Sequence, residues 1–226
     1  MTILHIETST TVCSVSLSND GCCIFSTANY DGMNHASLLS GFIAQALDVS
    51  TQQSLVLDAV SVSSGPGSYT GLRIGVSTAK GLCYGLEIPL IALSTLEIMT
   101  VQATKMTGAT NALFCPMIDA RRMEVYTALY DQHLQELAPV SATIIDEQSF
   151  LETLGSQEII FFGNGAQKCR ETISHPNAKF MDEVFPLASN MIDLAEKAYK
   201  NKQFVDVAYF EPFYLKEFYT TASKVS

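Results

Sequence analysis

Residues 63–86 read SSGPGSYTGLRIGVSTAKGLCYGL, and this stretch decides the fold because it joins an apolar, strand-like run at 57–62 to a long helix-like run. The turn Gly65-Pro66-Gly67 makes the join, since glycine allows backbone angles closed to other residues and proline restricts φ. The helical part contains four glycines in two pairs of spacing four, Gly71 with Gly75 and Gly81 with Gly85. Each glycine costs a helix interior roughly 0.5–1 kcal/mol relative to alanine, so each pair predicts a smooth helix face against which another backbone packs closely. The rest of the helix is apolar on one face, which predicts burial between two layers.

The composition indicates a globular chain with an acidic surface. Its 226 residues suffice for one large domain or two small ones, and 47% of them are hydrophobic. The 13 basic and 23 acidic residues give a net charge of −10, and no cluster of Lys and Arg is present to contact phosphates. This balance argues against nucleic acid binding by the chain alone. It favours solubility and, less strongly, a basic partner.

The cysteine pattern and the start of the chain indicate a reducing compartment. The six cysteines include no Cys-x-x-Cys pair and no zinc-binding spacing. The first residues, MTILHIETSTT, lack the basic region and long apolar run of a signal peptide, and no stretch of about 18 apolar residues follows. We therefore expect a cytoplasmic protein with free thiols and no membrane contact.

The order of apolar runs, acids and turns repeats along the chain. In the first half, an apolar run at 3–6 ends at Glu7, and a polar break separates it from an alternating, strand-like run at 12–17. In the second half, an apolar run at 112–118 ends at Asp119, and a polar break again precedes a strand-like run. This duplication predicts two similar α/β lobes that face each other.

The repeat also sets the expected lobe boundaries. We place the first lobe at 1–106, with an amphipathic helix over 35–47, and the second lobe at 107–203, with a helix over 146–154. The tail at 204–226 is rich in aromatic residues, which are unfavourable in a free terminus. We therefore expect this tail to pack back on the first lobe.

Three short segments have the residue types of a nucleotide site. An acid at the end of a strand, followed by small hydroxyl residues, can hold the phosphates of a nucleotide and its magnesium ion, and Glu7, Thr8 and Ser9 fit this description, as does Asp119. A glycine turn before a helix offers backbone N–H groups to an anion or to the edge of adenosine, as Gly163-Asn164-Gly165 would. The alternative for each segment is a tight turn. Weak binding of ATP or ADP with magnesium is therefore one hypothesis.

No segment contains a complete catalytic or metal-binding motif. Residues 65–71 are not a Walker A loop, because no Lys-Ser/Thr pair follows the last glycine. His35 is followed four residues later by Leu39, so a helical pair of metal-binding histidines is missing. The sequence has no Gly-x-Ser-x-Gly elbow and no Cys–His pairing that would indicate a nucleophile. We expect neither a metal site nor a catalytic residue.

Four segments together resemble the bacterial TsaB (YeaZ) family. They are ILHIETSTTVCSVSL at 3–17, the run at 63–97, MIDARRMEVY at 117–126 and FEPFYLK at 210–216. The resemblance implies an α/β, actin-like fold (ASKHA, ribonuclease H-like) of two duplicated lobes, paralogous to TsaD. It also implies a role in forming N6-threonylcarbamoyladenosine at position 37 of tRNAs that read ANN codons.

In that system a TsaD-type subunit transfers the threonylcarbamoyl group, and a TsaE-type ATPase joins the complex. The resemblance implies that TsaB is a non-catalytic scaffold, inactive alone, which requires no cofactor and meets tRNA only through the complex. TsaD-type relatives carry a His-x-x-x-His metal motif after a strand that contains proline. Counted from Pro89, those positions are Thr95 and Met99 here, and neither residue suits the metal. Glu7 stands where actin-like kinases usually have aspartate, which argues further against nucleotide binding.

The family's partner contacts use two helices of the first lobe, which map to 34–47 and 71–86. The resemblance further implies a homodimer through the same surface when the partner is absent. The residues expected at the interface are His35, Leu38, Leu39, Phe42, Gly71, Leu72, Gly75, Val76 and Ala79. Core packing is the alternative for each of them. If they form the interface, Gly75→Leu or Phe42→Glu should impair partner binding and leave the monomer folded.

Three other functions stay open at this point. One is a small actin-like kinase that uses ATP and magnesium. Another is a metallopeptidase-like protein of the glycoprotease family, although the histidine pair that it needs is missing. The third is a regulatory module that binds a different client protein.

Overall fold

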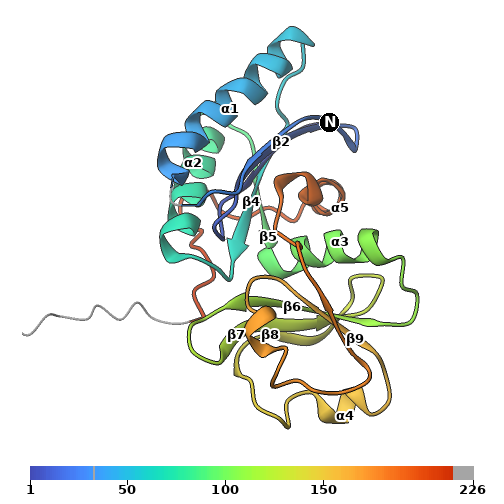
Figure 1. Ribbon diagram of the computed structural model, residues 1–226. Helices are drawn as coiled ribbons and strands as arrows, with labels where there is room; N and C mark the ends of the chain where they lie inside the picture. Colours follow the sequence, from blue (N-terminus) through green and yellow to red (C-terminus); the bar gives the residue numbers. More distant parts are fainter. Residues whose placement is uncertain (33, 216–226) are drawn as a thin grey trace, which may run out of the picture.

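The computed structural model describes residues 1–32 and 34–215, and two five-stranded sheets form its framework (Figure 1). The first-lobe sheet has the order β3-β2-β1-β4-β5, with strands β1 (Thr2–Glu7), β2 (Cys13–Asn19), β3 (Cys22–Asn29), β4 (Ala59–Gly65) and β5 (Leu90–Ser94). The second-lobe sheet has the order β8-β7-β6-β9-β10, with strands β6 (Leu113–Asp119), β7 (Glu124–Tyr130), β8 (Glu136–Ile144), β9 (Ile159–Phe162) and β10 (Ala178–Met181).

The two sheets have the same topology. In the first, β1 is central and pairs antiparallel with β2 and parallel with β4. In the second, β6 is central and pairs antiparallel with β7 and parallel with β9. Glu7 and Asp119 are the last residues of these two central strands. The predicted α/β fold of two duplicated lobes is therefore confirmed.

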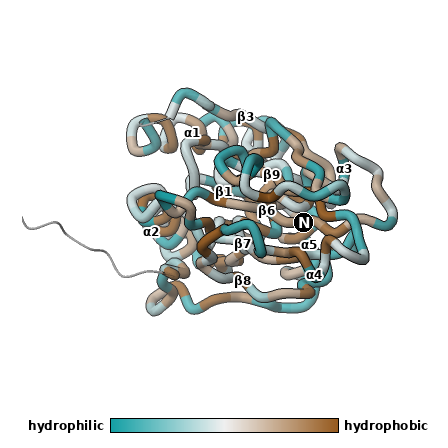
Figure 2. Tube along the Cα trace, turned by 60° about the horizontal axis from the view of Figure 1, so that its bottom comes forward, coloured by the Kyte–Doolittle hydropathy of each residue, from teal (hydrophilic) through white to brown (hydrophobic). Residues whose placement is uncertain are grey.

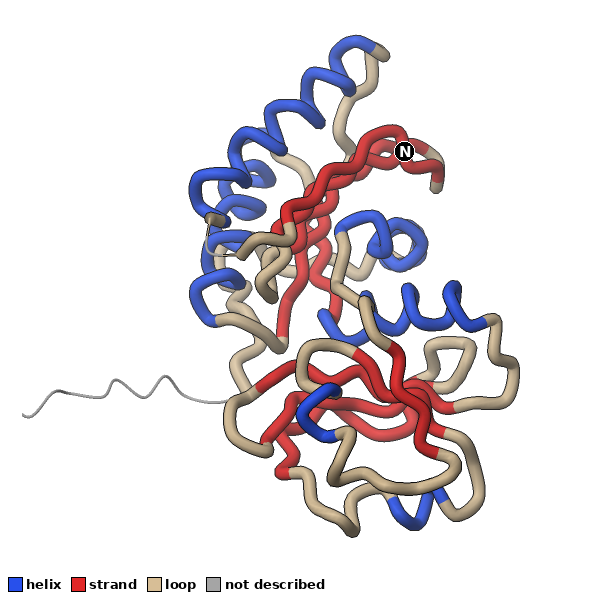
Figure 3. The backbone as a smooth tube through the Cα atoms, in the orientation of Figure 1, coloured by secondary structure: helices blue, strands red, loops and turns tan. Residues whose placement is uncertain are grey.

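Long helices cover both faces of the first sheet, whereas the second lobe has only short helical turns (Figure 3). The helical elements are α1 (His35–Gln52), α2 (Tyr69–Leu86), α3 (Thr95–Thr107), α4 (Leu151–Leu154) and α5 (Ile192–Lys200), with 3-10 turns η1 (Gln167–Cys169) and η2 (Ala188–Met191). The helices α1 and α2 lie on one face of the first sheet, and α3, η2 and α5 lie on the side that faces the second lobe (Figure 1).

The helix predicted over 146–154 forms only at its end, as the four-residue α4. Asp146 explains the difference, because its Oδ1 accepts hydrogen bonds from the Gln148 N–H at 3.0 Å and from the Ser149 hydroxyl at 2.8 Å. Such local side-chain bonds stabilise a turn at the expense of a helix. The glycine turn at 163–165 likewise leads into the single 3-10 turn η1 and not into a longer helix.

Helix α3 packs on both sheets and so holds the lobes together. On one side, Ile98 and Val101 belong to a buried cluster with Ile91 of the first sheet. On the other side, Met99 packs in a buried cluster with Phe114 of the second sheet. Figure 2 shows that hydrophobic segments follow the strands, whereas many of the connecting turns are hydrophilic. By packing on both sheets, α3 fixes the position of β1 relative to β6.

The chain returns to the first lobe earlier than the sequence-based boundary at 203. The apolar residues of η2 and α5, among them Met191 and Leu194, pack with Ile3 of β1 in a buried cluster. They cover the face of the first sheet that α1 and α2 leave open. The stretch 188–200, assigned to the second lobe from sequence, therefore contributes to the core of the first.

Residues 204–215, which we call the strap, run along the first lobe. The Val205 N–H donates to the Leu90 carbonyl at 3.0 Å, and the Phe213 N–H donates to the Ser64 carbonyl at 2.7 Å. Between these points, the Lys80 Nζ donates to the carbonyls of Ala208 and Phe210, both at 3.0 Å. The described part of the predicted tail thus packs on the first lobe, and residues 216–226 lie outside the described residues.

Replacing Lys80 by methionine is expected to loosen the strap. The change keeps the aliphatic stem but removes two hydrogen bonds from a charged donor, each worth about 1.5–3 kcal/mol. Limited proteolysis should then cleave within 204–215 at least tenfold faster than in the wild-type protein. Lys105→Met is the matched control, because Lys105 forms an exposed ion pair with Asp193 and lies away from the strap contacts of Lys80. Equal cleavage rates in both variants would show that Lys80 does not hold the strap.

Candidate functional site

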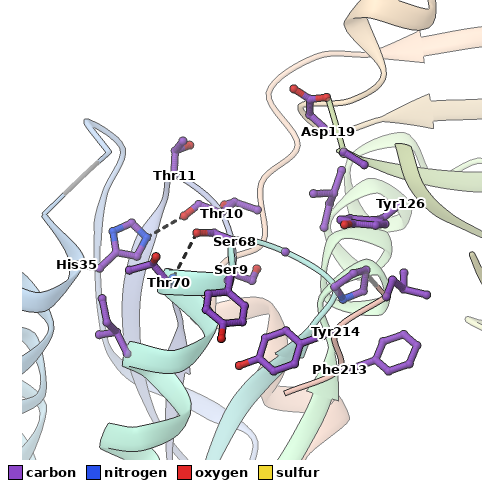
Figure 4. Close-up of a pocket in the computed structure, with 18 of the residues that line it drawn as sticks. Ser9, Thr10, Thr11, His35, Ser68, Thr70, Asp119, Tyr126, Phe213 and Tyr214 are labelled. Atoms are coloured by element: carbon purple, nitrogen blue, oxygen red, sulfur yellow. Dashed lines mark hydrogen bonds between the residues drawn. The ribbon is translucent and has the colours of Figure 1, made fainter. Parts of the chain in front are cut away.

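A cleft of about 940 Å³ lies between the lobes, where the two central strands end (Figure 4). The loop after β1 contributes Thr10 and Thr11, and the start of α2 contributes Ser68 and Thr70. The second lobe and the strap contribute charged and aromatic side chains: Asp119, Arg121, Tyr126, Phe213 and Tyr214. The site thus combines hydroxyl groups on the first-lobe side with charged and aromatic groups from the second lobe and the strap.

The glycines of α2 shape the first-lobe wall of the cleft. A Cβ atom at Gly71 would overlap the Thr8 carbonyl oxygen, and one at Gly75 would overlap the Thr8 hydroxyl. Because both side chains are absent, the loop after β1 rests directly on the helix, where the Thr8 hydroxyl donates to the Gly71 carbonyl at 2.8 Å. The predicted close approach of another backbone is confirmed at Gly71, whereas Gly75 faces the Thr8 side chain, and both contacts lie within the same lobe.

Six of the nine predicted interface residues lie in the core of the first lobe. They are at most 3% exposed or are buried glycines: Leu39, Gly71, Leu72, Gly75, Val76 and Ala79. Their assignment to a partner surface was wrong, because the apolar face of α2 packs on the sheet and the glycine face packs on Thr8. Gly75→Leu is therefore expected to disrupt the lobe itself and cannot test partner binding.

The remaining three predicted interface residues lie on α1. Leu38 and Phe42 are half-buried and retain a solvent-facing edge. His35 is buried at the start of the helix, where its Nε2–H donates to the Thr10 carbonyl at 2.8 Å. This bond fixes the loop that lines the cleft. His35 thus has a positioning role within the lobe.

The second glycine pair of α2 faces outward. Gly81 and Gly85 are exposed, and a Cβ atom at either position would meet no other atom within 4 Å. With Ile74 and Thr78, which are half-buried, they form one stripe along the helix, at the spacing that places residues on a common face. Helix α1 lies beside α2 (Figure 1). This stripe, which sequence reasoning did not separate from the inner pair, is open to a partner.

Glu7 is sealed beneath the loop after β1. It is fully buried, and its Oε1 accepts a hydrogen bond from the Ser9 N–H at 2.6 Å. Its Oε2 and the hydroxyls of Ser9 and Ser63 have no hydrogen-bond partner among the described residues. Burial raises the pKa of Glu7 to about 7, although the hydrogen bond from the Ser9 N–H opposes the shift. Glu7 and Thr8 do not line the cleft, whereas Ser9 does.

Asp119 reaches the cleft but already has protein partners. Its carboxylate forms an ion pair with Lys168, and its Oδ1 accepts the Arg121 N–H at 2.9 Å. Partial burial favours a higher pKa, but the bonds from Lys168 and Arg121 outweigh it and lower the pKa of Asp119. The Asp119 N–H donates to Asn164 Oδ1 at 2.9 Å. The side chain therefore braces the hairpin between β6 and β7.

The glycine turn at 163–165 packs against the end of β6 and does not line the cleft. Gly163 has φ of +97°, and a Cβ atom at Gly165 would lie 2.9 Å from the Ile118 carbonyl carbon. The Gly165 N–H donates to the Met117 carbonyl at 2.9 Å, so it is used within the lobe. Of the seven residues predicted for a nucleotide, only Ser9 and Asp119 border the cleft.

The two positions that correspond to the histidine pair are buried between the lobes. Thr95 is 0% exposed and Met99 is 1% exposed. Within 1–32 and 34–215, no group of three or more His, Cys, Asp or Glu residues could hold a metal ion. None of the helices in these residues has both the length and the apolar character needed to cross a bilayer.

Comparison with known proteins assigns the family. A family model described as TsaD, tRNA N6-adenosine threonylcarbamoyltransferase, matches residues 29–220. A relative from Escherichia coli (strain K12), tRNA threonylcarbamoyladenosine biosynthesis protein TsaB, is 32% identical over 226 residues, which cover 96% of this chain and 95% of that protein. The chain belongs to the TsaB family.

Other members of the TsaB family and solved structures agree with this assignment. The TsaB of Bacillus subtilis (strain 168) is 32% identical over 178 residues, which cover 76% of this chain and 75% of that protein. The structure of YeaZ from Pseudomonas aeruginosa matches with a TM-score of 0.79 and 26% identity, covering 95% of this chain and 99% of that one. A second Pseudomonas aeruginosa structure, of a protein with similarity to peptidase YeaZ, gives a TM-score of 0.83 at 25% identity, with 95% and 99% coverage.

Proposed function

We propose that this chain is a non-catalytic scaffold subunit of the complex that forms N6-threonylcarbamoyladenosine at position 37 of tRNAs reading ANN codons. In this proposal it supports a TsaD-type transferase in the cytoplasm, a TsaE-type ATPase joins the pair, and tRNA is engaged only within the complex. The chain alone is inactive and requires no cofactor, and ATP or ADP with magnesium binds only weakly. The names of the relatives and the TsaD family match support the pathway.

The observation that carries the non-catalytic role is that the acid at the end of β1 is unavailable to a ligand. Glu7 is buried behind the loop that lines the cleft, and its Oε1 is used by Ser9. The acid at the end of β6, Asp119, is paired with Lys168. A nucleotide-dependent kinase needs accessible acids to hold magnesium and phosphates, so these contacts favour the scaffold over the kinase.

We place the partner contact on the outward stripe of α2 and the adjoining edge of α1. Gly81 and Gly85 leave a bare helix surface, on which another helix can approach closely. Leu38 and Phe42 on α1 add apolar side chains that are only half-buried in the monomer. The same surface serves a homodimer when the TsaD-type partner is absent.

Gly85→Leu and Phe42→Glu are expected to weaken binding of the TsaD-type subunit at least tenfold. The first fills the bare surface, and the second places a charge in an apolar contact, which costs several kcal/mol if it is buried unpaired. Isothermal titration calorimetry would measure the affinity, and circular dichroism would report folding. Gln45→Glu, an exposed change on α1 that keeps the side-chain length, is the control for charge. Wild-type affinity in both variants would place the interface elsewhere.

Reconstitution by omission tests the proposed function directly. The TsaC-type adenylate synthase, the TsaD-type subunit and the TsaE-type ATPase of the same organism are mixed with unmodified tRNA, ATP, threonine and bicarbonate, with or without this chain. Modification that requires the chain, together with an inert chain alone, is expected. Equal modification without the chain would overturn the scaffold role, and micromolar ATP affinity with magnesium would favour the kinase.

A further inference from the structure

Three planar groups lie against one another where the strap meets the start of α2, and two of them, Tyr69 and Tyr214, line the cleft. The guanidinium of Arg73 lies 4.2 Å from the ring centre of Tyr69. The Tyr69 ring lies 4.9 Å from that of Tyr214, at an interplanar angle of 42°. Arg73 is exposed and Tyr214 is half-buried, so the group is partly open to solvent. Figure 4 shows Tyr214 beside the open space of the cleft.

The second lobe presents an aromatic ring and a cation across from this group. Tyr126 of β7 is half-buried and lines the same cleft, and Figure 4 shows it on the side opposite Tyr214 and Phe213. Arg121 also lines the cleft, in the hairpin that follows β6. Its backbone is held by the bond to Asp119, whose charge is in turn balanced by Lys168. Asp119 thus positions an arginine for the cleft.

These groups concentrate stacking surfaces and positive charge in a chain of net charge −10. Alternating aromatic rings and guanidinium groups are the means by which proteins hold unstacked bases and their phosphates. A double-stranded segment would not suit the cleft, because its bases are already stacked and offer no free faces. The cleft volume of about 940 Å³ is sufficient for one or two nucleotide units.

We propose that this cleft corner, formed by Tyr69, Tyr214, Tyr126 and Arg121, with Arg73 against the Tyr69 ring, binds a single-stranded segment of the tRNA substrate within the assembled complex. The inference rests on the proposed function, because the complex brings the RNA. It also explains why an acidic chain contributes to RNA binding only within the complex. Its few cationic contacts cannot overcome the repulsion between the acidic chain and the RNA, whereas contacts added by the partners can.

The test measures tRNA binding by the complete complex of this chain with its TsaD-type and TsaE-type partners. Tyr214→Ala removes a stacking surface, which is worth about 1–3 kcal/mol per base, and should weaken unmodified tRNA binding at least fivefold. Arg121→Ala should weaken binding and lower the slope of log affinity against log salt by about 0.7. Tyr209→Ala, on the same strap but outside the cleft, and Arg170→Ala, which pairs with Asp182 elsewhere in the second lobe, are the controls.

Gel filtration and thermal melting of each variant separate RNA binding from assembly. The proposal is supported if both cleft variants assemble normally, bind tRNA more weakly and raise the KM for tRNA more than they lower kcat. It is overturned if their tRNA affinity and salt slope match those of the controls, or if they fail to assemble with the partners. Omitting the chain from the reconstitution tests the proposed function separately. If modification requires the chain but the cleft variants bind tRNA like the controls, only this inference is overturned.

Discussion

Gly71→Ala is expected to destabilise the protein by about 3 kcal/mol or more, although it adds only one methyl group. The new Cβ atom would overlap the Thr8 carbonyl oxygen, and Thr8 is fully buried. Neither backbone can move away, because the Ser68 N–H donates to the Ser9 carbonyl at 2.6 Å and holds the loop on the helix. A stability of about 5–15 kcal/mol is usual for a domain, so much of it would be lost.

Gly81→Ala on the same helix is the matched control. A Cβ atom there meets no other atom within 4 Å, so the change should stabilise the helix by roughly 0.5–1 kcal/mol through its higher propensity. Urea unfolding followed by circular dichroism would give both free energies. If the two alanine variants were equally stable, the close packing of the loop on α2 would be wrong.

The duplicated fold was predictable because its signals are local. Each central strand is an apolar run that ends in an acid, and α2, expected at 71–86, begins only two residues earlier, at Tyr69. The strand β8 was not predicted, because it lies at the edge of its sheet and most of its residues are exposed or half-buried. Its sequence, ELAPVSATI, therefore lacks the regular alternation of a half-buried strand.

The site was less predictable because it depends on which faces meet in three dimensions. Both glycine pairs of α2 have the same spacing, yet Gly71 packs on Thr8 whereas Gly85 faces solvent. Spacing defines a helix face but not its neighbour. The sequence marked Tyr214 only as one of several aromatic residues in the C-terminal tail. Its contact with Tyr69 could not be predicted, because the two residues are 145 positions apart in sequence. Neither residue stood out as part of a site.

The two buried titratable groups of β1, His5 and Glu7, make stability depend on pH in opposite ways. His5 is fully buried, with Nδ1 2.7 Å from the Ser61 Oγ and Nε2 2.8 Å from the Ser18 Oγ. Burial lowers the pKa of His5 to about 3, so the folded state stays neutral while the unfolded state takes up a proton below about 6.5. Its contribution to stability is therefore lost as the pH falls from 6.5 toward 3.

Glu7 has the opposite effect, because burial raises its pKa from 4.5 to about 7. Between these values the folded state keeps a proton that the unfolded state has released, so the free energy of unfolding falls as the pH rises. Between 4.5 and 6.5 the slopes due to Glu7 and His5 cancel, and the wild-type protein alone would show little pH dependence from this pair.

Glu7→Gln separates the two effects. The variant cannot ionise at position 7, so its free energy of unfolding relative to the wild type should rise by about 3 kcal/mol between pH 4 and pH 8. This rise is independent of any difference in stability between the two proteins at low pH. Urea unfolding of both proteins across this range measures the difference, in which the contribution of His5 cancels. Ser9→Ala is a control, since it retains the carboxyl and the N–H that binds it. A constant difference between the Gln variant and the wild type would mean that Glu7 ionises normally, and hence that the loop above it admits water or a ligand from the cleft.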